Sequence, residues 1–286
     1  DYGVAYNLPK TEILIRATMT KTDRKAGEFY RFAERYLQIS NPVTEDETIY
    51  TLDQIEATTT GIADKSKSYL VEFKSNSVAP FVMLTKAGMI CAINEEVTLP
   101  DEFSFPKIQE DKSPTPVSPR SYLSEEILRA GSTAKQAELI AKQIYRLRET
   151  KTNILTGEAD NMPPDGKEYQ LVMKQLDEQE QALTSMFAGP TATHNRPKEF
   201  SKTPDEDDIN ARIVFRFSSK LGAVESNNLA GAPVTLNLVS KEPKAPLQPM
   251  TDKEQKAWDD KFSKGIIYNI PVKASLSIDF DGRNMV

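Results

Sequence analysis

Two residues of the chain belong to the types that most often do chemistry in proteins, one histidine and one cysteine among 286 residues. His194 could act as a general base, but a base needs a nucleophile and an orienting partner, and the sequence indicates neither. Cys91 lies in the apolar run Met89–Ile93, which favours a buried packing role over a reactive thiol. One imidazole and one thiol also exclude zinc and copper sites built from several such ligands. We therefore predict no catalytic residue, no cofactor and no metal site.

Acidic residues gather at two places in the sequence. Asp205–Asp208 precede a predicted strand, and Glu158, Asp160 and Asp165 lie in a predicted turn. Neither cluster has the alternating ligands and distant glutamate of a calcium-binding EF-hand loop, so we expect solvated turns. A glycoside hydrolase needs two carboxylates about 5–10 Å apart. Among 42 acidic residues some pair will meet that condition, so a glycan-directed hydrolase using a carboxylate pair stays open as an alternative function.

Tyrosine and arginine are favoured at binding hot spots, and the sequence offers two groups of them. Tyr30, Arg31 and Arg35 lie off the apolar stripe of a predicted helix, and Arg146 and Arg148 lie on a second one. We select these five as candidate binding residues. The competing interpretation is a solvated helix face with local ion pairs or, for the second group, pairing with an acidic neighbouring helix.

The charge balance argues against two classes of partner. The chain has 36 basic and 42 acidic residues, a net charge of −6 and a pI near 5.2. It therefore carries no basic field that would attract nucleic acid or anionic lipid. No apolar run approaches the roughly 20 residues that a membrane-crossing helix requires, so we predict no transmembrane segment.

The longest elements that must position these residues are two predicted helices. Apolar residues recur every three or four positions over 132–155 and again over 169–187, the spacing of one helix face. The first segment has five basic and two acidic residues, whereas 165–188 has two basic and five acidic. Turn-forming residues over 157–166 separate the helices, so the complementary charges predict a long antiparallel helical hairpin.

The rest of the patterning is typical of half-buried strands. The longest alternation covers 266–280, where every even position is apolar, and it predicts one strand with a buried face along its whole length. A helix over 28–37 is expected to cover the N-terminal sheet. Shorter alternating segments are 13–19, 69–73, 213–217 and 234–238.

Together these elements predict an α+β protein in which two β-rich regions flank a long antiparallel helical hairpin. Prolines, which remove backbone donors and fix φ, indicate an extended linker between the first region and the helices. The predicted parts are an N-terminal β-rich region with one helix over 1–105, the proline-rich linker over 106–121, the helical hairpin over 122–188 and a C-terminal β-rich domain over 189–286.

Several strings of the sequence resemble those of one family. They include Tyr6–Thr11, Phe29–Leu37, Ala141–Glu149 and Asn161–Gly166. The chain resembles an uncharacterised family of exported Bacteroidetes proteins that is known only as a domain of unknown function. The resemblance implies an N-terminal export signal and hence an extracytoplasmic location, periplasmic or associated with the outer membrane, including a lipid anchor on a removed leader. It implies no activity, cofactor or catalytic residue, and a chain that continues past Val286.

These observations favour a non-catalytic protein of the cell envelope that binds a protein partner. The expected contact is the helical hairpin or an exposed sheet edge, because such protruding elements are common peptide-recognition surfaces. Two alternatives remain beside it. One is the glycan-directed hydrolase, and the other is a carrier of a small apolar ligand held between sheet and helices.

Overall fold

The computed structural model describes residues 2–73, 78, 80–108, 116–164, 166–205, 208–242 and 249–286. The chain divides into two compact units. The strand unit comprises Asp1–Met19, Leu52–Ile108 and Pro197–Val286, and the helical unit comprises Thr20–Thr51 and Gln109–Arg196. Three strands pass from one unit into the other: β1 (Tyr2–Arg24), β2 (Glu47–Phe73) and β5 (Thr191–Lys202).

These three strands form one sheet in the order β2-β1-β5. Within the strand unit, β1 buries its odd-numbered apolar side chains Ile13, Ile15, Ala17 and Met19, as the alternation predicts. On the even side, Arg16 is a buried charge. Its guanidinium donates hydrogen bonds to the Glu56 carboxylate at 2.8 and 2.5 Å and to the Pro106 carbonyl at 2.6 Å. The buried charge therefore has hydrogen-bond partners.

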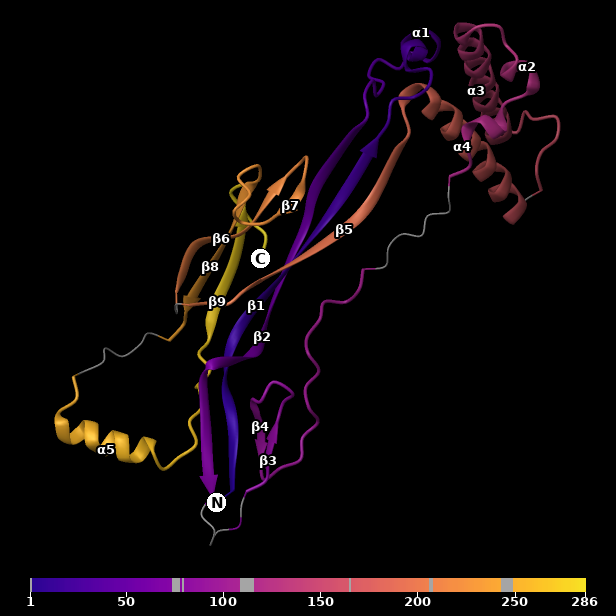
Figure 1. Cartoon of the computed structure of the whole chain (residues 1–286). Helices are drawn as coiled ribbons and strands as arrows, with labels where there is room; N and C mark the ends of the chain where they lie inside the picture. The colour runs from indigo at the N-terminus through magenta and orange to yellow at the C-terminus, as the bar shows by residue number, and fades with distance from the viewer. Residues whose placement is uncertain are drawn as a thin grey trace. The chain divides into compact units, whose positions relative to one another are not determined.

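A second sheet of the strand unit has five antiparallel strands in the order β10-β9-β8-β6-β7 (Figure 1). Its side chains Phe215, Val234, Leu236 and Ile278 are fully buried and form the centre of this sheet's core. The strands are β6 (Ile209–Ser218), β7 (Gly222–Val224), β8 (Ala232–Ser240), β9 (Ala274–Phe280) and β10 (Arg283–Asn284). A separate two-stranded sheet joins β3 (Val82–Leu84) to β4 (Ile90–Ile93).

The helical unit contains all described helices except α5. Its longest helix, α3, begins after Ser132, whose hydroxyl accepts a hydrogen bond from the Lys135 N–H, and ends at Gly157 with φ of 77°. The helices of this unit are η1 (Tyr30–Phe32), α1 (Ala33–Leu37), η2 (Pro119–Tyr122), α2 (Glu125–Leu128), α3 (Thr133–Thr156) and α4 (Lys167–Ala188).

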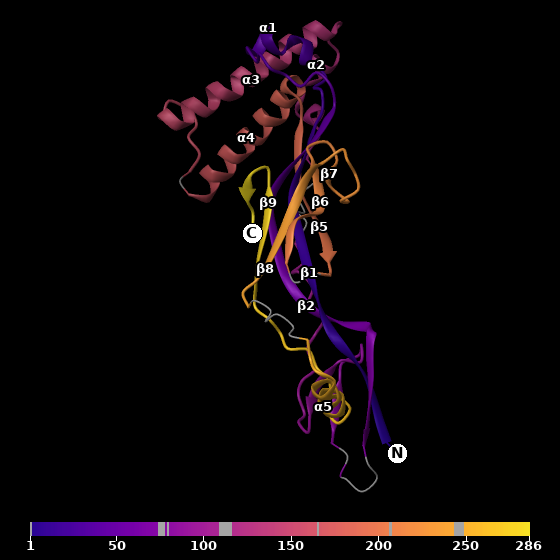
Figure 2. The same ribbon diagram turned by 90° about the vertical axis from the view of Figure 1, so that its left-hand side faces the viewer.

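One apolar core holds these helices together; Figure 2 shows their ribbons. The Phe29 and Phe187 rings meet at its centre with 5.8 Å between centroids. Because both rings are fully buried, this contact ties the segment before η1 to the end of α4. The buried members of the core are Phe29, Ala33, Leu37, Ile127, Ala137, Ile140, Ala141, Ile144, Leu183, Met186 and Phe187.

The predicted arrangement, two β-rich regions flanking a long antiparallel helical hairpin, is wrong, although the α+β class is consistent with the structure. Strands take up 38% of the described residues and helices 28%, and these strands form three sheets. One sheet joins β5, which follows the helices, to β1 and β2, which precede them. The helix expected to cover the N-terminal sheet instead contributes Phe29, Ala33 and Leu37 to the helical core.

The strand predicted over 266–280 is also shorter than expected. Only β9 (Ala274–Phe280) is a strand, and the chain from Gly265 to Lys273 has no regular structure. The reason is the partner strand: β8 pairs with β9 as far as Ser240 opposite Ala274 and then ends. The helix that precedes this segment, α5 (Asp252–Phe262), has no buried residue.

Candidate binding groove

The first group of predicted binding residues forms local contacts on the helical unit. The Arg31 Nε donates to the Tyr30 hydroxyl at 3.1 Å and its guanidinium lies 5.7 Å from the centre of that ring. The hydrogen bond from Arg31 to Tyr30 raises the pKa of Arg31. Arg35 lies over the ring of its neighbour Tyr36 at 5.4 Å. These side chains therefore stack on their own sequence neighbours.

Arg148 of α3 forms an ion pair with α4. Its Nε donates to the Glu180 carboxylate at 2.8 Å, and the Lys151 Nζ donates to the second oxygen at 2.8 Å. Burial raises the pKa of Glu180, but the hydrogen bonds from Lys151 and Arg148 outweigh it, so that the pKa is lowered. Arg148 thus follows the competing interpretation, in which the arginine pairs with the acidic helix.

Arg146, the fifth predicted residue, lines a groove of about 530 Å³ within the helical unit. One wall is a stripe of α3, because its members recur every three or four residues and so share a helix face. The other wall comes from η2, α2 and the residues between them. The lining residues are Tyr122, Leu123, Ser124, Glu126, Ile127, Leu139, Lys142, Gln143, Arg146, Leu147 and Thr150.

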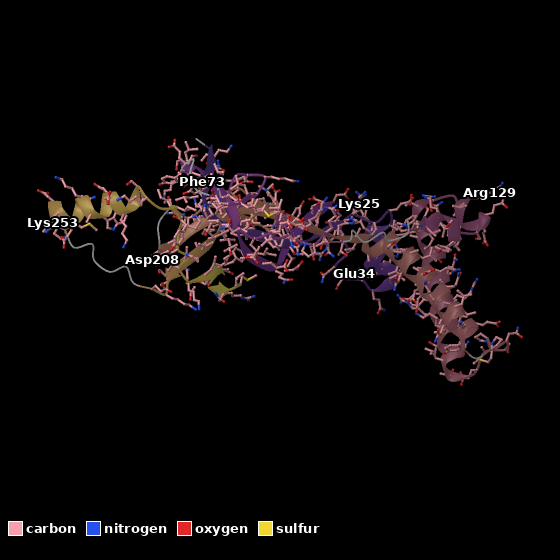
Figure 3. All side chains as sticks on the ribbon, turned by 90° about the horizontal axis from the view of Figure 1, so that it is seen from below. Lys25, Glu34, Phe73, Arg129, Asp208 and Lys253 are labelled. Carbon is pink, nitrogen blue, oxygen red and sulfur yellow. The ribbon has the colours of Figure 1, made fainter. Side chains whose placement is uncertain are left out.

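Two hydrogen bonds set how the walls face each other. The Gln143 side chain donates to the Tyr122 carbonyl at 3.0 Å, and the Gln136 side chain donates to the Leu128 carbonyl at 3.3 Å. The residue numbers fall on one wall as they rise on the other, so the segment from η2 to α2 runs antiparallel to α3. Figure 2 shows α2 beside α3, and Figure 3 labels Arg129, which follows α2.

The groove combines apolar walls with charges that differ in their partners. Lys142 pairs with Glu138, with 3.1 Å between nitrogen and oxygen, and hydrogen bonds from Lys142 and Lys135 lower the pKa of Glu138. In contrast, the side chains of Arg146 and Glu126 make no hydrogen bond or ion pair with any residue that the structure describes. The antiparallel register places Glu126 toward the start of α3 and Arg146 one helical turn beyond Gln143.

The remaining candidates from the sequence do not line this groove. His194 is a half-buried residue of β5, and Cys91 is half-buried in β4. Asp205 pairs with Arg212, and their hydrogen bond lowers the pKa of Asp205. Residues 165, 206 and 207 of the two acidic clusters lie outside the described residues. Across the described ranges, no three His, Cys, Asp or Glu residues lie together as a metal site would need.

Most of the groove was missed from the sequence. Tyr122 and Leu123 follow the proline-rich stretch, where two short helices gave no periodic signal. Leu147 was assigned to the apolar stripe of α3, and Leu139 was not singled out. The available signal was a second α3 stripe, from Leu139 through Gln143 to Thr150, that mixes apolar and polar residues. Such a mixed stripe is typical of a helix face that is neither core nor fully solvated.

Comparison with protein families gives one match, to the family described as Domain of unknown function (DUF4831), over residues 2–286. The chain belongs to this family. The predicted resemblance to a family of unknown function is thereby confirmed, while the Bacteroidetes origin stays a prediction. No curated protein matches the chain, and no solved structure does. In the described part of the chain, every helix is too short or too polar to cross a membrane.

Proposed function

We propose that the chain is a non-catalytic binding protein of the cell envelope, and that the groove between α3 and the η2–α2 segment receives a segment of a protein partner. The observation that carries this proposal is the Arg146 guanidinium, which lines the groove without a partner of its own among the described residues. An arginine beside apolar walls is typical of binding hot spots. A partner can form an ion pair with its guanidinium and at the same time bury the aliphatic part of its side chain.

The walls define the chemistry of the segment that fits. Leu123, Leu139 and Leu147 are half-buried and would be covered further by apolar side chains. Each would gain part of the roughly 1.5–3 kcal/mol that complete burial of such a side chain contributes. Arg146 would pair with a carboxylate, which an arginine can bind through two parallel hydrogen bonds. The partner segment therefore combines at least one acidic residue with apolar neighbours.

The carboxylates with a shifted pKa give the hydrolase alternative no support. The pKa values of Asp23, Asp64, Glu138, Glu180 and Asp205 are all lowered. Lowering is the shift of carboxylates held by hydrogen bonds or cations, whereas a glycosidase acid needs a raised pKa. The carrier alternative needs an apolar pocket closed around its ligand, and the groove instead mixes charged and apolar walls.

The envelope location in this proposal rests on the family resemblance and its expected export signal. Fractionation of cells that produce the complete natural protein tests it. The proposal expects the protein in the envelope or periplasmic fraction, and recovery in the cytoplasmic fraction alone would contradict it.

Selection from a random peptide library displayed on phage tests the groove itself. The unaltered chain serves as bait, and enriched peptides are then measured against Arg146→Glu and against Arg283→Glu. Arg283 is an exposed arginine of β10. Arg283→Glu is therefore a matched control, because it makes the same change of charge outside the groove. The proposal predicts peptides with an acidic residue among apolar ones that lose at least about tenfold in affinity against Arg146→Glu only. Equal loss against both variants, or peptides indifferent to both, would contradict it.

A further inference from the structure

A row of exposed apolar side chains lies in the strand unit, on the segment between α5 and β9. The segment Ile266–Val272 keeps the alternation of a strand, yet its outer apolar side chains face solvent. Tyr268 is 73% exposed, Ile270 76% and Val272 55%. Large apolar side chains exposed in a row mark interaction sites more often than isolated ones do.

The backbone of this segment is bonded on one side. The N–H of Ile267 donates to the Tyr6 hydroxyl, and that hydroxyl donates to the Ile267 carbonyl, each at 2.9 Å. The Lys273 carbonyl accepts from the Lys241 N–H at 2.8 Å. The backbone groups of the odd-numbered Ile267 and Lys273 therefore point toward β1 and the end of β8. In an extended chain, successive backbone groups alternate in direction, so even-numbered residues direct theirs to the opposite side.

The opposite side of the segment carries unpaired backbone groups. Farther along the chain, in β9, the even-numbered Ile278 bonds to Met285 and Val286 on the side away from β8, which is the same alternation. The backbone N–H groups of Tyr268, Ile270 and Val272, by contrast, have no partner among the residues that the structure describes. An open edge with unpaired N–H and C=O groups and apolar side chains is a template for another strand.

We propose that this edge pairs with the same edge of a second copy of the chain, antiparallel and centred on Asn269. The argument for a second copy is that the segment is complementary to itself. Pairing about Asn269 places Ile266 opposite Val272 and Tyr268 opposite Ile270, so every apolar residue of the outer row meets an apolar partner. Lys273 falls opposite Gly265 and Lys264 falls opposite Ala274, so no two like charges are directly opposite each other.

The register also accommodates the proline. When Asn269 faces its copy as a pair without hydrogen bonds, Pro271 occupies the same kind of position, and its missing N–H faces away from the partner. Tyr268, Ile270 and their counterparts then exchange about four backbone hydrogen bonds with the second copy, two donated by each chain. The groups that Ile267 uses to bond Tyr6 stay on the inner side, so dimerisation breaks no existing bond.

Cysteine crosslinking tests this register. Opposite residues in a pair without hydrogen bonds lie about 4.5 Å apart at Cα, within the range that a disulfide spans. In a Cys91→Ala background, which removes the one native thiol, Asn269→Cys is expected to form a covalent dimer under mild oxidation. Lys273→Cys is the matched control, because the register separates its two copies by roughly 27 Å and no crosslink is expected.

Sedimentation of the unaltered chain over a wide concentration range provides the second measurement. We expect a reversible dimer, and we expect Ile270→Asp to raise its dissociation constant by more than about a hundredfold, because each dimer loses the apolar side chain twice. A chain that stays monomeric at every concentration, or equal crosslinking at positions 269 and 273, would overturn the proposal. Neither result would bear on the groove, whose residues belong to the other unit.

Discussion

Replacing Glu180 by glutamine probes the contact between α3 and α4. The carboxylate is 18% exposed and accepts hydrogen bonds from Arg148 and Lys151, each at 2.8 Å, while Lys151 also pairs with Asp177. Glu180→Gln keeps the shape of the side chain but removes its charge. The variant leaves two partly buried cations, 40% and 23% exposed, with one neutral acceptor between them.

The magnitude follows from the exposure of the partners. A hydrogen bond to a charged group contributes about 1.5–3 kcal/mol when buried, and an exposed ion pair about 0–1 kcal/mol. Because Glu180 is mostly buried and Arg148 is not, we expect Glu180→Gln to lower the free energy of unfolding of the helical unit by about 1–2 kcal/mol near neutral pH.

The pH dependence gives this prediction its sign. Interactions with Lys151 and Arg148 hold the folded pKa of Glu180 below its ordinary value. Its contribution to stability is therefore present above the ordinary glutamate pKa and is lost as the pH falls through the lowered folded value. The difference between the unaltered chain and Glu180→Gln should shrink as the solution is acidified, because both then carry a neutral side chain.

Urea unfolding followed by circular dichroism at the helical band provides the assay. The matched control is Glu178→Gln: Glu178 is an exposed residue of the same helix that pairs with Lys174 at 3.7 Å, and the change should cost no more than about 0.5 kcal/mol. Equal effects of the two substitutions at neutral pH, or a Glu180 effect that is unchanged in acid, would refute the reasoning.

Three further substitutions test other parts of the fold. Phe187→Ala removes a fully buried ring of the helical core and should cost about 3–5 kcal/mol in urea unfolding; a loss below about 1 kcal/mol would contradict the assigned core. Gly189→Ala introduces a methyl group against the Lys25 carbonyl at a residue with φ of 101°, so the melting temperature should fall, and an unchanged value would argue against this close approach. Thr251→Ala removes the N-cap of α5, whose capping box also uses Glu254; faster amide exchange confined to α5 is expected, at a cost of about 1 kcal/mol, and unchanged exchange would contradict the cap.

The sequence predicted local elements better than their partners. The 3.6-residue pattern placed both α3 and α4 to within a few residues, because each helix completes its hydrogen bonds within itself. The row of apolar residues at even positions over 266–280 was an equally clear pattern. A strand, however, needs a neighbouring strand to complete its hydrogen bonds, and β8 ends at Ser240. A sequence pattern indicates which side chains are apolar and would be stabilised by burial. It does not indicate whether a second strand lies close enough to pair with them.

The same limit explains the errors in overall arrangement and in the candidate site. Pairing of β5 with β1 joins residues far apart in the chain, and no local pattern specifies such a contact. Arg146 could be selected by type alone, whereas its place in a groove depends on how η2 and α2 lie against α3. Arg148, two residues along the same helix, shared the same signal and instead pairs with Glu180.

Site-specific photocrosslinking in cells of the source organism tests most directly whether the groove binds a partner. Thr150 lines the groove, whereas Thr152 lies two residues along α3, about 200° around the helix axis. Both are exposed, and both bond their hydroxyl to the carbonyl four residues earlier. The account predicts that a photoreactive residue at 150 crosslinks to one discrete protein through an acidic, apolar segment, that Arg146→Glu abolishes this product, and that position 152 gives none. Equal products from both positions, or a product from 150 that survives Arg146→Glu, would contradict it.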